Sequence, residues 1–273
     1  MSARFATSSI LALSLALSAG GTVPAVAMSV DEFVTISMIA GWRVKPDLHM
    51  AGIRIQMAPG WHTYWRQPGD AGIPPQLDWT GSVNFERAEI VWPVPDRFDQ
   101  NGLSTLGYSG EVILPLAVTP SGAGEIGLKG ALFLGVCEDV CIPVEVSLAI
   151  ALPDGGAAHA GIADSLARQP DEAGEQGRAD ATCSVTPIED GLRVSIRLDL
   201  GGQGVPDQVV LESAAANVWV SEPQLVMDAD HVVATSDFVP PEAKPFVLER
   251  SKVVATLFQP GTVTAFSGCK VAP

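Results

Sequence analysis

The residues of this sequence best suited to chemistry are two cysteines, Cys137 and Cys141, which are separated by Glu138, Asp139 and Val140. A disulfide between them would close a very small loop. The chain-entropy relation gives such a loop about 2 kcal/mol of stabilisation, against roughly 4–5 kcal/mol for a loop that spans a domain. This bond would be a weak structural cross-link, and its position is suited to reversible thiol–disulfide exchange.

Three interpretations of the cysteine pair remain open at this point: a redox pair, an inert structural bond and half of a metal site. The acidic neighbours Glu138 and Asp139 disfavour a thiolate, so a redox pair here would react with a docked partner. A metal site lacks further ligands, because the histidines show no ligand spacing around the pair. These histidines are His49, His62, His159 and His231.

The remaining cysteines, Cys183 and Cys269, lie near the two ends of the C-terminal half. Four cysteines in an exported chain allow three connectivities. The spacing favours a local, reducible bond between Cys137 and Cys141 and a long-loop structural disulfide between Cys183 and Cys269.

Strand patterns dominate the rest of the chain. An apolar run over residues 126–136 precedes the cysteine pair, and residues 144–150 alternate apolar and polar side chains after it. This places the pair on a β-hairpin. Many short strands with frequent turns predict an all-β protein built from sandwiches.

Four segments follow from this pattern. Residues 1–27 read as a signal peptide, with one charge (Arg4), a short apolar stretch and the cleavage pattern Ala25-Val26-Ala27. We expect one sandwich domain over residues 30–152 and a linker rich in Gly, Ala and charge over 153–180. A second, smaller β-sandwich domain over 181–273 follows.

The signal predicts that the mature protein lies outside the cytoplasm. The formal net charge of −15 becomes −16 when residues 1–27, with their single positive charge, are removed. This acidity excludes nucleic acid and anionic lipid as expected partners, since both require a positive field. No later segment offers about 18 uninterrupted apolar residues, as a membrane-spanning helix requires. An uncleaved N-terminal anchor is the alternative to a cleaved signal.

Aromatic residues crowd into the segment 61–66, where Trp61, Tyr64 and Trp65 surround His62 and Arg66. This density permits a surface that stacks a sugar or a peptide. The interpretation that we favour is that Trp61 and Trp65 pack in the core of the sandwich.

Two groups of motifs resemble the periplasmic N-terminal (alpha) domain of the thiol:disulfide interchange protein DsbD, in its ScsB-like branch. They are Gly60-Trp61-His62-Thr63-Tyr64-Trp65-Arg66 with Pro68-Gly69-Asp70-Ala71-Gly72-Ile73-Pro74-Pro75, and Val136-Cys137-Glu138-Asp139-Val140-Cys141-Ile142-Pro143. The resemblance covers about residues 30–152.

The resemblance implies an immunoglobulin-like sandwich with the exchanging pair, Cys137 and Cys141, on a hairpin. It implies electron flow from a membrane-embedded reductase, through a thioredoxin-like domain, to oxidised periplasmic client proteins, with no bound cofactor. Cys141 would be the first cysteine to attack or to be attacked. This sequence lacks the family's membrane-embedded and thioredoxin-like parts, so donor and acceptor would be other polypeptides.

Relatives also carry a loop that caps the cysteines, and residues 99–108 are its expected counterpart here. The segment from Asp99 to Leu103 has no aromatic residue, although Tyr108 could substitute for one. The candidate cap or partner surface consists of Asp99, Gln100, Asn101, Tyr108, Trp61, His62 and Trp65.

The expected function is therefore a thiol–disulfide exchange module that relays electrons from a membrane reductase to oxidised clients. The alternative is a non-enzymatic periplasmic protein-binding or copper-binding module with a structural disulfide. Its copper form is motivated by potential ligands that lie near one another in sequence, namely His49, Met50, Met57 and His62.

Overall fold

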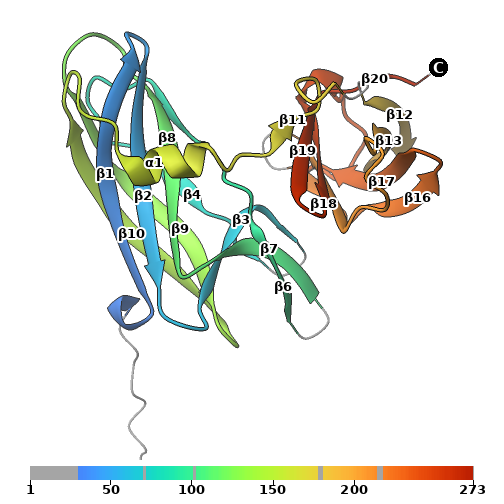
Figure 1. The fold of residues 1–273 in the computed structure, drawn as a ribbon, viewed down its shortest axis with the longest axis horizontal. Helices are drawn as coiled ribbons and strands as arrows, with labels where there is room; N and C mark the ends of the chain where they lie inside the picture. The colour runs from blue at the N-terminus through green and yellow to red at the C-terminus, as the bar shows by residue number, and fades with distance from the viewer. Residues whose placement is uncertain (1–29, 70–71, 101–102, 178–180, 214–217, 273) are drawn as a thin grey trace, which may run out of the picture.

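The computed structural model describes residues 30–69, 72–100, 103–177, 181–213 and 218–272. Its strands form two separate pairs of sheets, one from each half of the chain (Figure 1). The predicted signal peptide, residues 1–27, lies outside the described residues. The described part of the chain contains no helix long and apolar enough to cross a membrane.

The N-terminal half is a sandwich of a four-stranded and a six-stranded sheet. The first has the order β1-β2-β8-β5, with β1 (Val34–Lys45), β2 (Leu48–Met57), β8 (Glu111–Thr119) and β5 (Arg87–Ile90). The second has the order β10-β9-β3-β7-β6, with β10 (Cys141–Leu152), β9 (Ile126–Cys137), β3 (His62–Gly69), β7 (Leu103–Ser109) and β6 (Asp96–Gln100), and β4 (Gln76–Asp78) pairs with β9. A short 3-10 helix, η1 (Val30–Glu32), precedes β1.

The C-terminal half repeats this layout on a smaller scale. Its first sheet has the order β11-β19-β18-β14, with β11 (Asp171–Glu172), β19 (Thr262–Ser267), β18 (Val253–Gln259) and β14 (Gln208–Ser213). Its second has the order β15-β17-β13-β12-β20, with β15 (Trp219–Val220), β17 (His231–Val239), β13 (Gly191–Asp199), β12 (Thr182–Ile188) and β20 (Lys270–Val271), and β16 (Gln224–Asp228) pairs with β17. The 3-10 helix η2 (Arg250–Lys252) precedes β18.

Alternating side chains build the core of each sandwich. In β2, Ala51, Ile53 and Ile55 are fully buried and belong to the same core cluster as Leu132 and Leu134 of β9, which are also fully buried. Burying one such aliphatic side chain stabilises the fold by about 1.5–3 kcal/mol. The all-β, immunoglobulin-like class predicted from the sequence is confirmed.

The segment 153–180, expected as a linker, contains a helix, α1 (Ala160–Leu166), and the strand β11. Ile162 of α1 is fully buried against Met50 of β2 and Ile113 of β8. The helix therefore packs on the outer face of the first sheet (Figure 1).

Candidate functional site

The cysteine pair lies at the tip of the β9–β10 hairpin. Cys137 is the last residue of β9, Cys141 is the first residue of β10, and the two are directly opposite each other in the antiparallel register. They form a disulfide, with Glu138, Asp139 and Val140 as the exposed turn. Because the hairpin register sets the two α-carbons side by side, the strands themselves hold the cysteines within bonding distance.

The two sulfur-bearing residues differ in their access to solvent. Cys137 is 1% exposed, whereas Cys141 is an exposed residue on the edge strand of its sheet. In β9 the side chains of Leu134 and Val136 point into the sandwich. Cys137 is the next residue after Val136, so its side chain points to the outer face. Cys141 is therefore the more accessible residue of the pair, while Cys137 is shielded.

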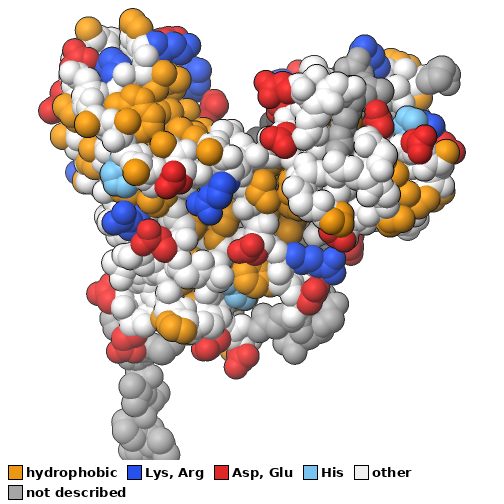
Figure 2. All heavy atoms as spheres, in the orientation of Figure 1, with side chains coloured by type: hydrophobic (Ala, Val, Ile, Leu, Met, Phe, Trp, Pro, Cys, Tyr) orange, Lys and Arg blue, Asp and Glu red, His pale blue; other side chains and the backbone are white. Residues whose placement is uncertain are grey.

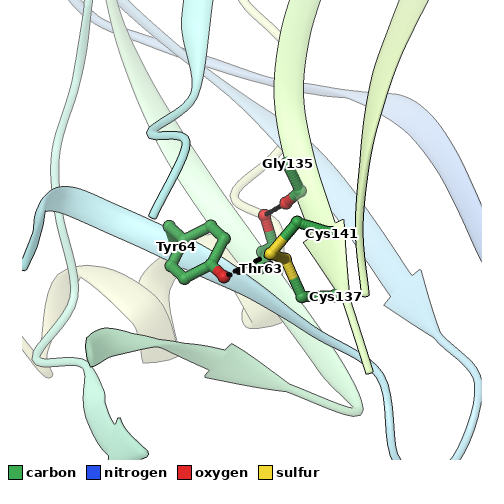
Figure 3. The surroundings of a disulfide bond; sticks show 5 residues. All are labelled: Thr63, Tyr64, Gly135, Cys137 and Cys141. Carbon is green, nitrogen blue, oxygen red and sulfur yellow. Dashed lines mark hydrogen bonds between the residues drawn. A yellow bond between two sulfur atoms is a disulfide. The ribbon is translucent and has the colours of Figure 1, made fainter. Parts of the chain in front are cut away.

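A buried tyrosine covers the disulfide. The hydroxyl of Tyr64, on β3, lies 2.8 Å from Sγ of Cys137 and 3.1 Å from Sγ of Cys141 (Figure 3). Disulfide sulfurs carry no hydrogen, so the hydroxyl is the donor in both contacts. Tyr64 is 2% exposed, and burial raises the pKa of its phenol. The hydroxyl therefore keeps its proton at neutral pH and remains a donor to sulfur.

A histidine lies beside the buried cysteine. His62 of β3 is directly opposite Cys137 in the β3–β9 pair, so both side chains project from the same face of the sheet. The imidazole stacks on Phe98 of β6, with ring centroids 4.7 Å apart, and meets the edge of Tyr64 at 5.4 Å. Burial lowers the pKa of His62, which favours the neutral imidazole next to the disulfide.

Glycines allow the close packing that positions Tyr64. A Cβ added at Gly72 would lie 2.3 Å from Cβ of Pro68 and 2.7 Å from Cδ1 of Tyr64. A Cβ at Gly135 would lie 2.8 Å from Cβ of Ile73. Only a residue without a side chain fits either place, so Gly72 and Gly135 can pack closely around the tyrosine ring.

The structure corrects the idea that the tryptophans form a partner surface. Trp61 is 9% exposed and stacks on Phe33, while Trp65 is fully buried and meets the edge of Phe258. Both indoles belong to the core: Trp61 immediately precedes β3, and Trp65 lies on the face of β3 that points into the sandwich. The interpretation of these residues as core packing is the one that the structure bears out.

The expected cap segment, residues 99–108, lies on the β6–β7 hairpin, and the aromatic residue of this hairpin that reaches the site is Phe98, which stacks on His62. Asp99 is exposed and accepts a hydrogen bond from Arg97 at 3.0 Å. Tyr108 does not face the cysteines, because its side chain lies in the core and donates a hydrogen bond to the carbonyl of Pro93 at 2.7 Å.

The structure says less about Gln100 and Asn101, two further residues of the predicted cap. Gln100 ends β6, and Asn101 falls outside the described residues.

Sequence reasoning missed the contact between Tyr64 and the sulfurs and the role of Phe98. The signal for Phe98 was its position one residue before the segment chosen as the cap. No local signal linked Tyr64 with cysteines more than 70 residues away.

The potential copper ligands do not converge. His49 is the second residue of β2, and His62 is the first residue of β3. The length of β2 therefore separates the two histidines. Both ring nitrogens of His49 face backbone carbonyls, of Met50 at 2.8 Å and of Pro153 at 3.1 Å. Among the described residues, no group of three or more His, Cys, Asp or Glu side chains is placed to hold a metal ion.

The second disulfide joins Cys183 of β12 to Cys269, just before β20, across 86 residues. Cys183 is fully buried in the core of the C-terminal sandwich. The bond ties the two ends of that sandwich together and lies in a different domain from the exposed Cys141.

Comparisons with known proteins agree with this geometry. Residues 31–153 match the family described as thiol:disulfide interchange protein DsbD, N-terminal. A solved structure, the N-terminal periplasmic domain of ScsB from Proteus mirabilis, matches with a TM-score of 0.63 and 21% identity, over 90% of this chain and 97% of that one. At this identity the match shows a shared fold. The curated proteins include no match. The resemblance to the DsbD N-terminal domain is confirmed over residues 31–153.

Proposed function

We propose that this chain, whose N-terminal domain resembles that of the DsbD proteins, is a thiol–disulfide exchange module that works through Cys137 and Cys141. One observation carries the proposal: the exposed Cys141 is bonded to a shielded Cys137 whose sulfur faces a buried hydroxyl donor. A structural bond needs neither an accessible sulfur nor a donor for a leaving thiolate.

Reduction begins when a thiolate of a reducing partner attacks Sγ of Cys141. The new bond joins the partner's sulfur to Cys141, the Cys137–Cys141 bond breaks, and its electron pair leaves on Cys137. The Tyr64 hydroxyl, 2.8 Å from this sulfur, donates a hydrogen bond to the thiolate that forms. The partner's second thiolate then attacks the mixed disulfide, so the partner leaves oxidised and both cysteines take up protons.

The reduced pair passes the same two electrons to a client. The thiolate of Cys141 attacks a client disulfide, and Cys137 resolves the mixed disulfide by attacking Sγ of Cys141. The client leaves as a dithiol, and the Cys137–Cys141 bond forms again. The complete exchange cycle needs no cofactor, because one dithiol is oxidised for each disulfide that is reduced.

The surroundings favour exchange inside a docked complex. Glu138 and Asp139 place negative charge close to Cys141 in sequence, which raises the electrostatic cost of a free thiolate there. A partner that covers this turn and supplies positive charge would lower that cost. We propose a thioredoxin-like or membrane-embedded thiol reductase as the donor, oxidised periplasmic proteins as clients, and the periplasm, reached through the signal in residues 1–27, as the compartment.

The reduction potential of the Cys137–Cys141 pair tests the proposal. A Cys183→Ser, Cys269→Ser variant is equilibrated with glutathione or dithiothreitol buffers, and free thiols are counted. A potential of about −180 to −270 mV, the range of exchanging dithiols, is expected. A value below about −300 mV would mark a structural bond and favour the non-enzymatic alternative. The same titration with the Cys183–Cys269 bond intact controls for effects of the background substitutions.

A further inference from the structure

The strand β16 forms an open edge of the C-terminal domain. Among the described strands it pairs with β17 alone. Antiparallel pairing directs the backbone groups of alternate residues toward the neighbouring strand, and the groups of the residues between them point away. At least two residues of β16 therefore present N–H and C=O groups that no other described strand pairs with. An edge of this kind is a template for pairing with another chain.

The edge of β16 is accessible and apolar. All five residues of the strand are exposed, and Leu225, Val226 and Met227 are 41%, 63% and 42% exposed with their backbone included. Leu225 and Met227 lie opposite the buried Ala234 and Val232 of β17, so they project from the core side of the sheet. Neither is among the side chains that pack against the C-terminal core cluster. The strand therefore extends past the core of its own domain.

The surface that carries β16 lies away from the disulfide. Figure 2 shows hydrophobic side chains gathered on the C-terminal lobe, in the place where Figure 1 labels β16. This part of the lobe is turned away from the N-terminal domain, which carries the β9–β10 hairpin (Figure 1). A contact made through β16 would leave the Cys137–Cys141 site uncovered.

Several other outermost strands differ from β16 in their charge. The strands β5, β6 and β11 each end a sheet, and each carries at least two charged residues. Charged side chains on an edge strand oppose its pairing with another chain. The one charged residue of β16 is Asp228, whose carboxylate accepts a hydrogen bond from Arg197 of β13. The edge at β16 is therefore apolar and locally neutral, and charge does not protect it.

The sequence of β16 is complementary to itself. Two copies of a chain with a formal net charge of −15 repel each other, so a contact between them requires a locally neutral surface, which β16 supplies. When two copies of the strand run antiparallel with their Val226 residues opposite each other, Leu225 lies opposite Met227 of the second copy. Gln224 then lies opposite Asp228 of the second copy, and its amide can donate a hydrogen bond to that carboxylate. No two like charges are opposite in this register.

We propose that β16 binds β16 of a second copy of this chain, antiparallel and about a two-fold axis at Val226. The two sheets then join into one, and each copy contributes the same residues to the interface, as a two-fold axis requires. The paired surface is small for a specific interface, so the dimer is reversible, with a dissociation constant between about 10 and 500 μM. This inference goes beyond the proposed function, because the disulfide takes no part in it.

Sedimentation over a range of protein concentrations tests the interface. The wild type should associate as its concentration rises, and Val226→Lys should weaken this association at least about tenfold. The substitution sets two lysines directly opposite each other and removes two valines that the dimer would bury. Val83→Lys is the matched control, because it adds the same charge at a valine of the N-terminal domain that is 70% exposed. This control should associate as the wild type does.

Disulfide cross-linking tests the register. Val226→Cys and Gln224→Cys are each made in a Cys137→Ser, Cys141→Ser background, which removes the exchanging pair. Directly opposite residues have α-carbons about 4.5–5.5 Å apart, within the range of a disulfide, so Val226→Cys should form a covalent dimer on oxidation. The Gln224→Cys residues of two copies would lie four residues apart along the strands, about 13 Å, and should not cross-link. Equal cross-linking of both variants would overturn this register.

Three results would overturn the dimer. The first is a wild type that remains monomeric up to about 0.5 mM. The second is a Val83→Lys variant that loses association as Val226→Lys does, since added charge alone would then explain the effect. The third is a monomeric wild type in which Val226→Lys slows exchange with a peptide disulfide, since β16 would then bind a client. Val226→Lys should exchange with oxidised glutathione as the wild type does, and a wild type without exchange contradicts the proposed function alone.

Discussion

The hydroxyl of Tyr64 lies 2.8 Å from Sγ of Cys137, although the two residues are 73 positions apart in sequence. The hydroxyl donates a hydrogen bond to this sulfur, and the same sulfur becomes the leaving thiolate when a partner attacks Cys141. A hydrogen bond to a charged group stabilises it by about 1.5–3 kcal/mol, and more than 1.4 kcal/mol corresponds to at least a tenfold change in rate.

Tyr64→Phe should therefore slow reduction of the disulfide by dithiothreitol about tenfold, because the Cys137 thiolate loses its donor. Stopped-flow measurement of the second-order rate constant checks this. Tyr108→Phe is the matched control, since that buried hydroxyl donates to the carbonyl of Pro93 and should not affect the rate. Equal rates in wild type and Tyr64→Phe would show that the hydroxyl has no part in the exchange.

The two disulfides should differ in what they contribute: Cys183–Cys269 to the stability of the fold, and Cys137–Cys141 to thiol–disulfide exchange. Cys183→Ser with Cys269→Ser opens a loop of 86 residues and should lower the free energy of unfolding by about 2–5 kcal/mol, with exchange retained. Cys137→Ser with Cys141→Ser opens a loop of four residues, should lower it by no more than about 2 kcal/mol, and should abolish exchange. Urea unfolding and the glutathione assay measure both effects. The reverse pattern would identify Cys137–Cys141 as the structural bond.

The interdomain ion pair should couple the domains. Arg66 and Glu212 keep 28% and 15% of their side chains exposed, so we discount the energy of a buried charged pair for solvent screening. A double-mutant cycle with Arg66→Met and Glu212→Gln should give a coupling free energy of about 1–2 kcal/mol in urea unfolding.

Arg66→Lys keeps the charge and loses the two-pronged geometry, so it should recover part of that coupling. A coupling near zero would mean that the pair does not hold β14 against the N-terminal domain.

Burial of His62 should make stability depend on pH. Its folded pKa lies below the ordinary value of 6.5, so between these two values the unfolded chain binds more protons than the folded one. Stability from this group is complete above about pH 6.5 and falls as the pH drops toward the folded pKa. In His62→Gln, the loss of stability between pH 7.5 and 5 should be smaller than in the wild type, as measured by urea unfolding at each pH. An identical loss in both proteins would contradict this.

Local sequence determined the setting of the cysteine pair. Alternation in residues 144–150 and the apolar run before Cys137 require a hairpin, and the hairpin register brings Cys137 opposite Cys141. The pairing of Cys183 with Cys269 likewise agrees with the spacing that predicted it. Period-two patterns of this kind are readable because one face of each strand meets water and the other meets the core.

The surroundings of the pair were decided by the tertiary structure. Residues 62–65 of β3 are all buried, because the sandwich covers one face and the disulfide, Gly72 and the β6–β7 hairpin cover the other. Because both faces of this strand are covered, its sequence shows no alternation of polar and apolar residues. Nothing in it distinguishes Trp65, which lies in the core, from Tyr64, which faces the sulfurs. Sheet order, which sets β3 between β9 and β7, places Tyr64 and Phe98 at the site.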